Sequence, residues 1–174
     1  LRALALYPKM TSYHLSFASV NLNLASALSQ KQELSDEDRQ TVTRLIQQAI
    51  QSDKNAITLR PNDATTHLAL ASTYRNIINV ADGSSQFAID AYERAITLDR
   101  ANPTIRLQLG GLLYQLSSTA TDKTQKDTYL SRAKAEFQTA IQLKKDYPNA
   151  YYNLAKTYEI NSDYTNAITL LQEA

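Results

Sequence analysis

Few residues of this chain could carry acid–base or metal chemistry. There are two histidines and no cysteine. The absence of cysteine excludes disulfides, thiolate metal sites and cysteine catalysis. The other candidates are His14, His67 and a short acidic run, Glu33 and Asp36 to Asp38.

These residues do not form a metal-ligating pattern. A zinc site needs three or four protein ligands, and no further histidine or acidic cluster accompanies the two histidines. The acidic run lacks the alternating oxygen ligands of a calcium loop. Ser35 followed directly by three acids instead predicts a helix N-terminus, with Ser35 as the N-cap. We therefore expect no metal and no cofactor.

Catalytic motifs are missing as well. Gly110 and Gly111 lack the spacing and the following Lys-Ser/Thr of a phosphate-binding loop. No serine lies in a nucleophile-elbow pattern. The sequence therefore predicts that this chain has no catalytic residue and is not an enzyme, although a longer parent protein could be one.

Composition and charge narrow the class further. The 174 residues are 43% hydrophobic with only three glycines and four prolines, which argues against disorder and against a turn-rich β fold. Eighteen basic and 17 acidic residues give a net charge of +1, which offers no strong field for nucleic acid. No stretch approaches 18 consecutive apolar residues, so we expect no membrane insertion.

Two phrases recur along the chain. The first, Ala-aliphatic-x-Leu, closes a predicted helix and is followed by proline or polar turn residues; it begins at Ala3, Ala56, Ala95 and Ala140. The second is a small residue three positions before a tyrosine, and its copies are Ala71 with Tyr74, Gly111 with Tyr114, and Ala155 with Tyr158. Such spacings define one helical face.

Both phrases resemble the tetratricopeptide repeat, a helix–turn–helix unit of 34 residues, and the resemblance covers essentially the whole chain. It implies an all-α fold, an α-solenoid of antiparallel helical hairpins with a right-handed superhelix. We expect one solenoid over 1–174. Its parts are the end of a preceding helix (1–10), unit one (11–63), unit two (64–103), unit three (104–147) and a partial unit four (148–174).

The chain departs from the family pattern at several points. Unit one is too long, which predicts an elongated second helix from Ser35 to Leu59. The polar segment from Ser117 to Thr128 is expected to extend a loop and a helix start. Asp53 occupies a position where the family has an aromatic residue. Each glycine of the Gly110-Gly111 pair costs a helix interior about 1 kcal/mol relative to alanine.

The resemblance also gives the histidines and tyrosines a structural role. His14 and His67 fall at the fourth position of their first helices, where Leu107 and Tyr151 stand in the other units. We therefore expect both histidines to pack in the core rather than to ligate a metal. Five of the eleven tyrosines fall at core positions, whereas Tyr152 falls on the groove; the five are Tyr74, Tyr92, Tyr114, Tyr151 and Tyr158.

A ligand of this family would bind the concave groove lined by the first helix of each hairpin. The partner-binding residues so predicted are Leu68, Ser72, Arg75, Gln108, Leu112, Gln115, Tyr152 and Lys156. In unit one the same positions are Ser12, Leu15, Ser19 and Leu22. Some members of the family bind the acidic C-termini of chaperones through lysine, asparagine and arginine side chains at set positions of the groove. Here Leu15, Ser19 and Ala69 stand at such positions, so this binding mode is not expected. An extended or helical segment with apolar anchors fits better, and the alternative is a solvated groove in a chain that acts as a spacer.

The leading hypothesis is therefore a non-catalytic scaffold for a protein or peptide partner. Exposed terminal hairpins would also allow homo-oligomers. An RNA-reading helical repeat is disfavoured by the balanced charge. Because the chain starts at Leu1 and stops at Ala174 inside an apolar-periodic run, we expect a piece of a longer polypeptide.

A finer resemblance concerns that parent. The unequal units and the segment from Gln47 to Asp63 look like the repeat tails of bacterial O-antigen-ligase-like membrane proteins. This resemblance implies an alternative function, an accessory module of a membrane glycan ligase or polymerase. It would lie on the extracytoplasmic side of a bacterial membrane.

Overall fold

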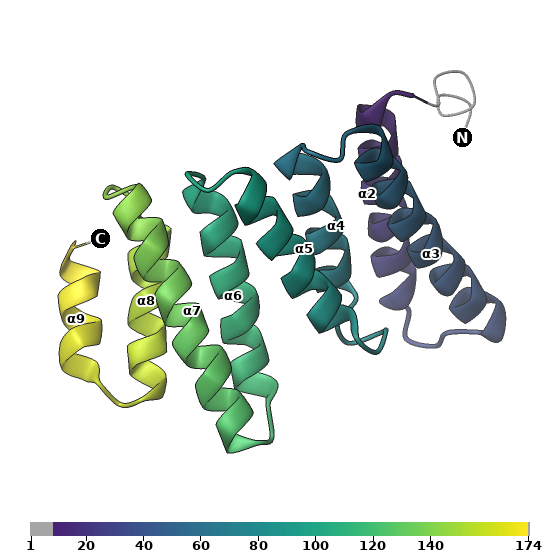
Figure 1. Ribbon diagram of the computed structural model, residues 1–174. Helices are drawn as coiled ribbons and strands as arrows, with labels where there is room; N and C mark the ends of the chain where they lie inside the picture. The colour runs from purple at the N-terminus through teal and green to yellow at the C-terminus, as the bar shows by residue number, and fades with distance from the viewer. Residues whose placement is uncertain (1–8, 174) are drawn as a thin grey trace. The chain divides into compact units, whose positions relative to one another are not determined.

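The computed structural model describes residues 9–173, and all regular structure in that range is helical (Figure 1). The helices are α2 (Thr11–Ser29), α3 (Asp36–Leu59), α4 (Ala64–Asn76), α5 (Ser84–Leu98), α6 (Pro103–Thr119), α7 (Lys123–Leu143), α8 (Pro148–Ile160) and α9 (Tyr164–Glu173). Most of the predicted end of a preceding helix, residues 1–8, lies outside the described residues, as does Ala174.

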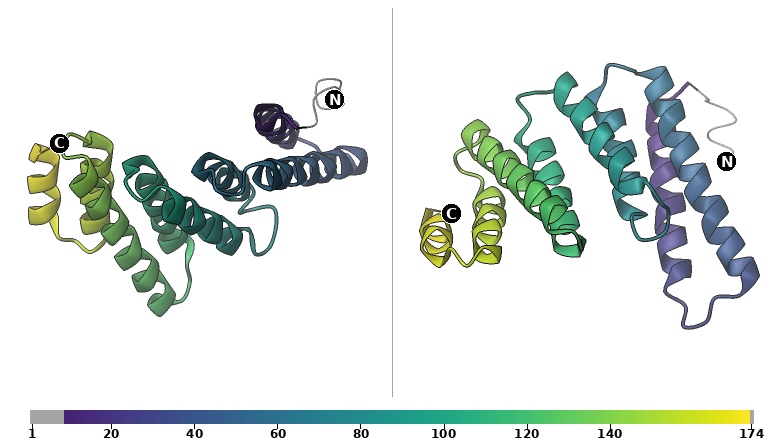
Figure 2. Two further views of the ribbon diagram at one scale, coloured as in Figure 1. Left: turned by 45° about the horizontal axis from the view of Figure 1, so that its top comes forward. Right: turned by 60° about the horizontal axis from the view of Figure 1, so that its bottom comes forward.

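Consecutive helices pair into hairpins. The strongest packing joins α2 to α3, α4 to α5, α6 to α7 and α8 to α9. In both views of Figure 2 the long helices α2 and α3 lie side by side. The hairpins group into two compact units, Leu1–Leu98 with α2 to α5 and Asp99–Ala174 with α6 to α9. We call these the first unit and the second unit; they are distinct from the four repeat units predicted from the sequence. The division into tetratricopeptide units remains our interpretation of the sequence.

Side-chain caps begin most of the helices. Ser35 accepts a hydrogen bond from the Asp38 backbone N–H while the Asp38 carboxylate accepts one from the Ser35 N–H, a complete capping box. The predicted start of the elongated helix is thus confirmed. Asp63 and Asn102 cap α4 and α6 with one side-chain hydrogen bond each, accepted from the N–H groups of Thr65 and Thr104.

Small residues lie buried where the helices contact one another, as the pattern predicts. Ala49, Ala56, Ala71, Ala88 and Ala95 in the first unit are fully buried, as are Ala133 and Ala140 in the second. Without bulky side chains at these points, neighbouring helices approach closely, and large residues fill the spaces between them. The aromatic positions of α5 and α7, Tyr92 and Phe137, are among the largest fully buried side chains.

Two expectations need correction. The segment from Ser117 to Thr128 extends a helix start, as expected, but not a loop, because α6 continues to Thr119 and α7 already begins at Lys123. Asp122 accepts a hydrogen bond from the Gln125 N–H at 2.8 Å and so starts α7 early. His67 is only half-buried rather than in the core, and its Nε2 lies 3.0 Å from the Pro61 carbonyl oxygen.

His14, in contrast, is buried as expected. Its Nδ1 lies 3.2 Å from the Ser52 hydroxyl, which donates to the His14 carbonyl at 3.0 Å. This pair ties α2 to α3. Within residues 9–173 no group of three or more acidic or histidine residues is placed to hold a metal ion. None of the helices described above combines the length and the apolar character that spanning a membrane requires.

Candidate functional site

The surface between α2 and α4 in the first unit carries three adjoining hollows, of about 430, 170 and 290 Å³. Leu15 is shared by the first two, and Leu22, Asn23 and Asn76 are shared by the second and third. The hollows therefore follow the two helices as one track, which we call the α2–α4 groove. It lies on the first helices of two successive hairpins.

The groove is lined by neutral polar side chains with apolar residues between them. Ser19, Asn23, Ser26 and Asn76 are exposed, and each lines at least one hollow. The half-buried Leu15 and Leu22 supply the apolar contacts. Amide side chains both donate and accept hydrogen bonds, so this lining can meet either kind of backbone group.

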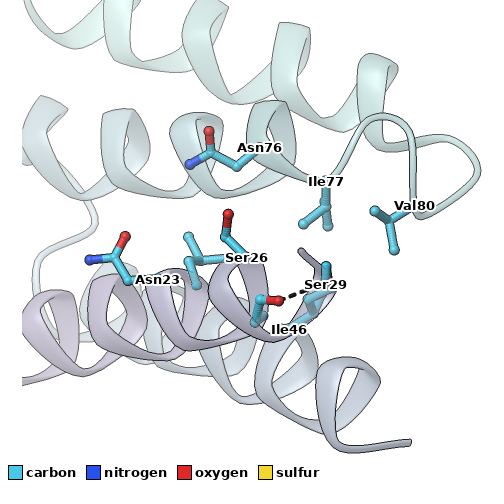
Figure 3. Close-up of a pocket in the computed structure, with 9 residues that line it drawn as sticks. Asn23, Ser26, Ser29, Ile46, Asn76, Ile77 and Val80 are labelled. Atoms are coloured by element: carbon cyan, nitrogen blue, oxygen red, sulfur yellow. Dashed lines mark hydrogen bonds between the residues drawn. The ribbon is translucent and has the colours of Figure 1, made fainter. Parts of the chain in front are cut away.

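The 290 Å³ hollow closes the groove where α2 and α4 end. Figure 3 shows Asn23 and Asn76 on the two flanking helices, with Ile77 and Val80 beyond the end of α4. Ile77 is buried, whereas Val80 is 64% exposed. The Ser29 hydroxyl donates to the Ala25 carbonyl at 2.8 Å and so is held back against its own helix. This end of the groove is the more apolar one.

A carboxylate lies beneath the central hollow. Asp53 belongs to α3, is 1% exposed, and lines the 170 Å³ space. Its Oδ2 accepts a hydrogen bond from the Thr73 hydroxyl of α4 at 2.5 Å. Burial raises the pKa of Asp53 to about 6, and the Thr73 hydrogen bond opposes that rise.

The opposite end of the groove carries charges of both signs. Lys9, Arg60 and Asp63 line the 430 Å³ hollow. An Arg60 nitrogen lies 3.6 Å from an Asp63 oxygen. The pKa of Asp63 is lowered, chiefly because its carboxylate accepts a hydrogen bond from the Thr65 backbone N–H. These charges lie at an exposed rim, where ion pairs contribute little to stability.

A separate hollow of about 350 Å³ lies between α8 and α9 in the second unit. Tyr152, Tyr164, Ile168 and Leu171 border it and are between 51% and 60% exposed. Lys156 and Glu159 are its charged residues. The exposed apolar side chains thus come from both α8 and α9.

The residues predicted to bind a partner have different environments. Ser72 lines the α2–α4 groove, and Tyr152 and Lys156 line the α8–α9 hollow. Four more are half-buried and line neither of these hollows: Leu68, Arg75, Gln108 and Gln115. Leu112 is fully buried and cannot contact a partner, so its assignment to a binding surface is wrong.

Sequence reasoning missed Asn23 and Asn76. Each lies four residues after a serine of the predicted groove, Ser19 and Ser72. Residues four apart lie on one helical face. The repeated Ser-x-x-x-Asn spacing on two successive first helices was therefore a usable signal.

Antiparallel hairpins stacked by small residues define the class of helical-repeat proteins. Within this chain, residues 136–169 match the family model of the tetratricopeptide repeat. The match begins in α7 and ends in α9, and these residues form a tetratricopeptide repeat. No curated protein is significantly similar in sequence to this chain.

Solved structures share the fold over nearly the whole chain. The crystal structure of MamA is 20% identical, with 99% of this chain and 80% of that chain covered and a TM-score of 0.67. TTC0263, a thermophilic TPR protein of Thermus thermophilus, is 15% identical over 90% and 72% of the two chains, with a TM-score of 0.60. The fold is therefore the tetratricopeptide-type α-solenoid, as predicted.

An enzyme also appears among the similar structures. A mutant O-GlcNAc transferase of Thermobaculum terrenum is 14% identical, with a TM-score of 0.54; the match covers 94% of this chain but 27% of that one. The repeat match supports a protein-interaction scaffold in general.

Proposed function

We propose that this chain holds an extended segment of a partner protein in the α2–α4 groove. The observation that carries the proposal is the run of adjoining hollows lined by two matching Ser/Asn pairs, Ser19 with Asn23 and Ser72 with Asn76. No catalytic step is involved. The scaffold acts by positioning its partner.

The lining suits peptide backbone. An extended segment leaves its N–H and C=O groups without internal hydrogen bonds, so a binding surface must supply both donors and acceptors. The amides of Asn23 and Asn76 offer both. Leu15 and Leu22 then provide apolar contact for the side chains of the segment, which is the source of most binding free energy.

Four half-buried residues that line no hollow of the α2–α4 groove remain proposed, from the sequence, as contacts of a partner: Leu68, Arg75, Gln108 and Gln115. The hypothesis of an accessory module on a membrane glycan ligase remains an alternative drawn from the sequence.

The experiment selects peptides from a random display library on the purified chain and then measures their affinities for variants. We expect Asn23→Ala together with Asn76→Ala to weaken binding about tenfold or more, because each lost hydrogen bond leaves a backbone group unpaired. Gln47→Ala with Asn55→Ala, two exposed amides on α3, is the matched control and is expected to bind normally. Peptides that bind the Asn23/Asn76 variant as tightly as wild type, or a library without binders, would refute the proposal.

We further propose that copies of the chain associate through the α8–α9 hollow. Its apolar border is exposed, and its two charged residues, Lys156 and Glu159, have opposite signs. In a two-fold pairing each lysine can face the glutamate of the other copy, because the same patch is used on both sides.

A further inference from the structure

Asp53 replaces an aromatic ring in the repeat. The corresponding residues of α5 and α7, Tyr92 and Phe137, fill their sites and are almost fully buried. A carboxylate is much smaller than either ring. Asp53 lines the 170 Å³ hollow together with Ala18 of α2 and Ala69 of α4.

The carboxylate has no cationic partner among residues 9–173. The acids of the ion pairs Lys31–Asp38, Arg60–Asp63 and Arg106–Glu136 all lie elsewhere in the chain. Thr73 occupies one carboxylate oxygen, Oδ2, and no described residue donates to Oδ1. A buried charge without a counter-ion is costly, so a cation that reached it would be bound strongly.

Among the residues that the structure describes, Asp53 is the one charged residue in the lining of the 170 Å³ central hollow. Apart from it, every residue that lines the central hollow is uncharged; the polar ones are Ser19, Asn23, Ser72, Thr73 and Asn76. The hollow is therefore negative at its base and neutral around its mouth. Alanine walls beside a deep acceptor suit an unbranched apolar stem that ends in a compact cation.

We propose that Asp53 is the specificity-determining residue of the α2–α4 groove and receives the ammonium group of a lysine from the bound segment. The lysine stem passes between Ala18 and Ala69, and the ammonium donates hydrogen bonds to the carboxylate. The neutral side chains at the mouth of the hollow bind the backbone on either side. This inference rests on the proposed function of the groove.

The test uses peptides selected on the wild-type chain. We expect them to share one lysine, and replacing that lysine by norleucine, which keeps the stem and removes the charge, to weaken binding about tenfold to a hundredfold. Asp53→Asn should weaken the lysine peptide by a similar factor and leave the norleucine peptide unchanged. The norleucine measurement uses the unaltered protein, so it stands even if the variant folds poorly.

The outcomes separate the two proposals. If peptides lose affinity with the Asn23/Asn76 variant but are indifferent to norleucine and to Asp53→Asn, the lysine site is refuted and the groove remains. If no peptide depends on Asn23 and Asn76, both fail. A titration with n-butylammonium gives an independent check: we expect amide shifts at Thr73 and Ser19 that vanish in Asp53→Asn and are absent with neutral n-butanol. Shifts that persist in the variant would overturn the site.

Discussion

At the residue scale, two effects act on the Asp53 carboxyl in opposite directions. Burial raises its pKa from 3.8 to about 6, and the hydrogen bond from Thr73 lowers it. Between pH 3.8 and about pH 6 the Asp53 carboxyl therefore holds its proton in the folded protein but loses it in the unfolded chain. The contribution of Asp53 to stability is therefore greatest below pH 3.8 and is lost as the pH rises through about 6.

We predict that Asp53→Asn removes this loss. Relative to wild type, the variant should gain up to about 3 kcal/mol of unfolding free energy between about pH 4 and about pH 7.5, since one pKa unit corresponds to about 1.4 kcal/mol. Urea unfolding followed by circular dichroism at both pH values measures the difference. Asp38, Asp63 and Asp163, whose pKa values are lowered, are present in both proteins and cancel in it.

Asp82→Asn makes the same chemical change at an exposed residue and serves as the control. Its unfolding free energy should follow that of wild type at both pH values. If Asp53→Asn also follows wild type, the carboxyl does not have the raised pKa that burial gives it.

At the element scale, the contact of α6 with α7 depends on a missing side chain. A Cβ built on Gly110 would lie 2.6 Å from Cε1 of Phe137, whose ring is fully buried. Carbon atoms in contact are normally about 3.5–4.0 Å apart. The glycine that looked unfavourable in the middle of a helix is therefore required where the Phe137 ring packs against α6.

We predict that Gly110→Ala lowers the unfolding free energy by about 1–2 kcal/mol, because overpacking costs more than the gain in helix propensity returns. In a Phe137→Leu background the same substitution should be much less harmful, since the smaller side chain leaves room for the methyl group. A double-mutant cycle from urea unfolding measures this coupling. Equal effects of Gly110→Ala in both backgrounds would show that the ring does not impose the glycine.

At the scale of the whole molecule, a helical repeat buries its apolar face against whatever lies beside it. On α9 that face consists of Tyr164, Ile168 and Leu171. With a net charge of +1, two copies repel each other only weakly. Self-association through this face is therefore consistent with both its chemistry and its charge.

We predict that Ile168→Glu weakens self-association, because it places an unpaired charge within an apolar contact. Sedimentation equilibrium should give a dimer mass for wild type and a monomer mass for the variant at the same concentration. Val20→Glu changes an apolar residue of similar exposure on α2, 53% against 56%, and should leave the mass unchanged. A wild-type chain that stays monomeric at high concentration would refute the proposed contact.

The sequence alone determined the helices and their pairing. Alanine and turn residues recur at fixed spacing, and local effects such as the Ser35 capping box set helix starts, so the all-α repeat fold and the long helix α3 could be predicted. Only tertiary packing decided which polar residues face a shared space. The register marked Asp53 as unusual and Leu112 as accessible, but hollows and burial depend on the volumes of side chains from several helices at once.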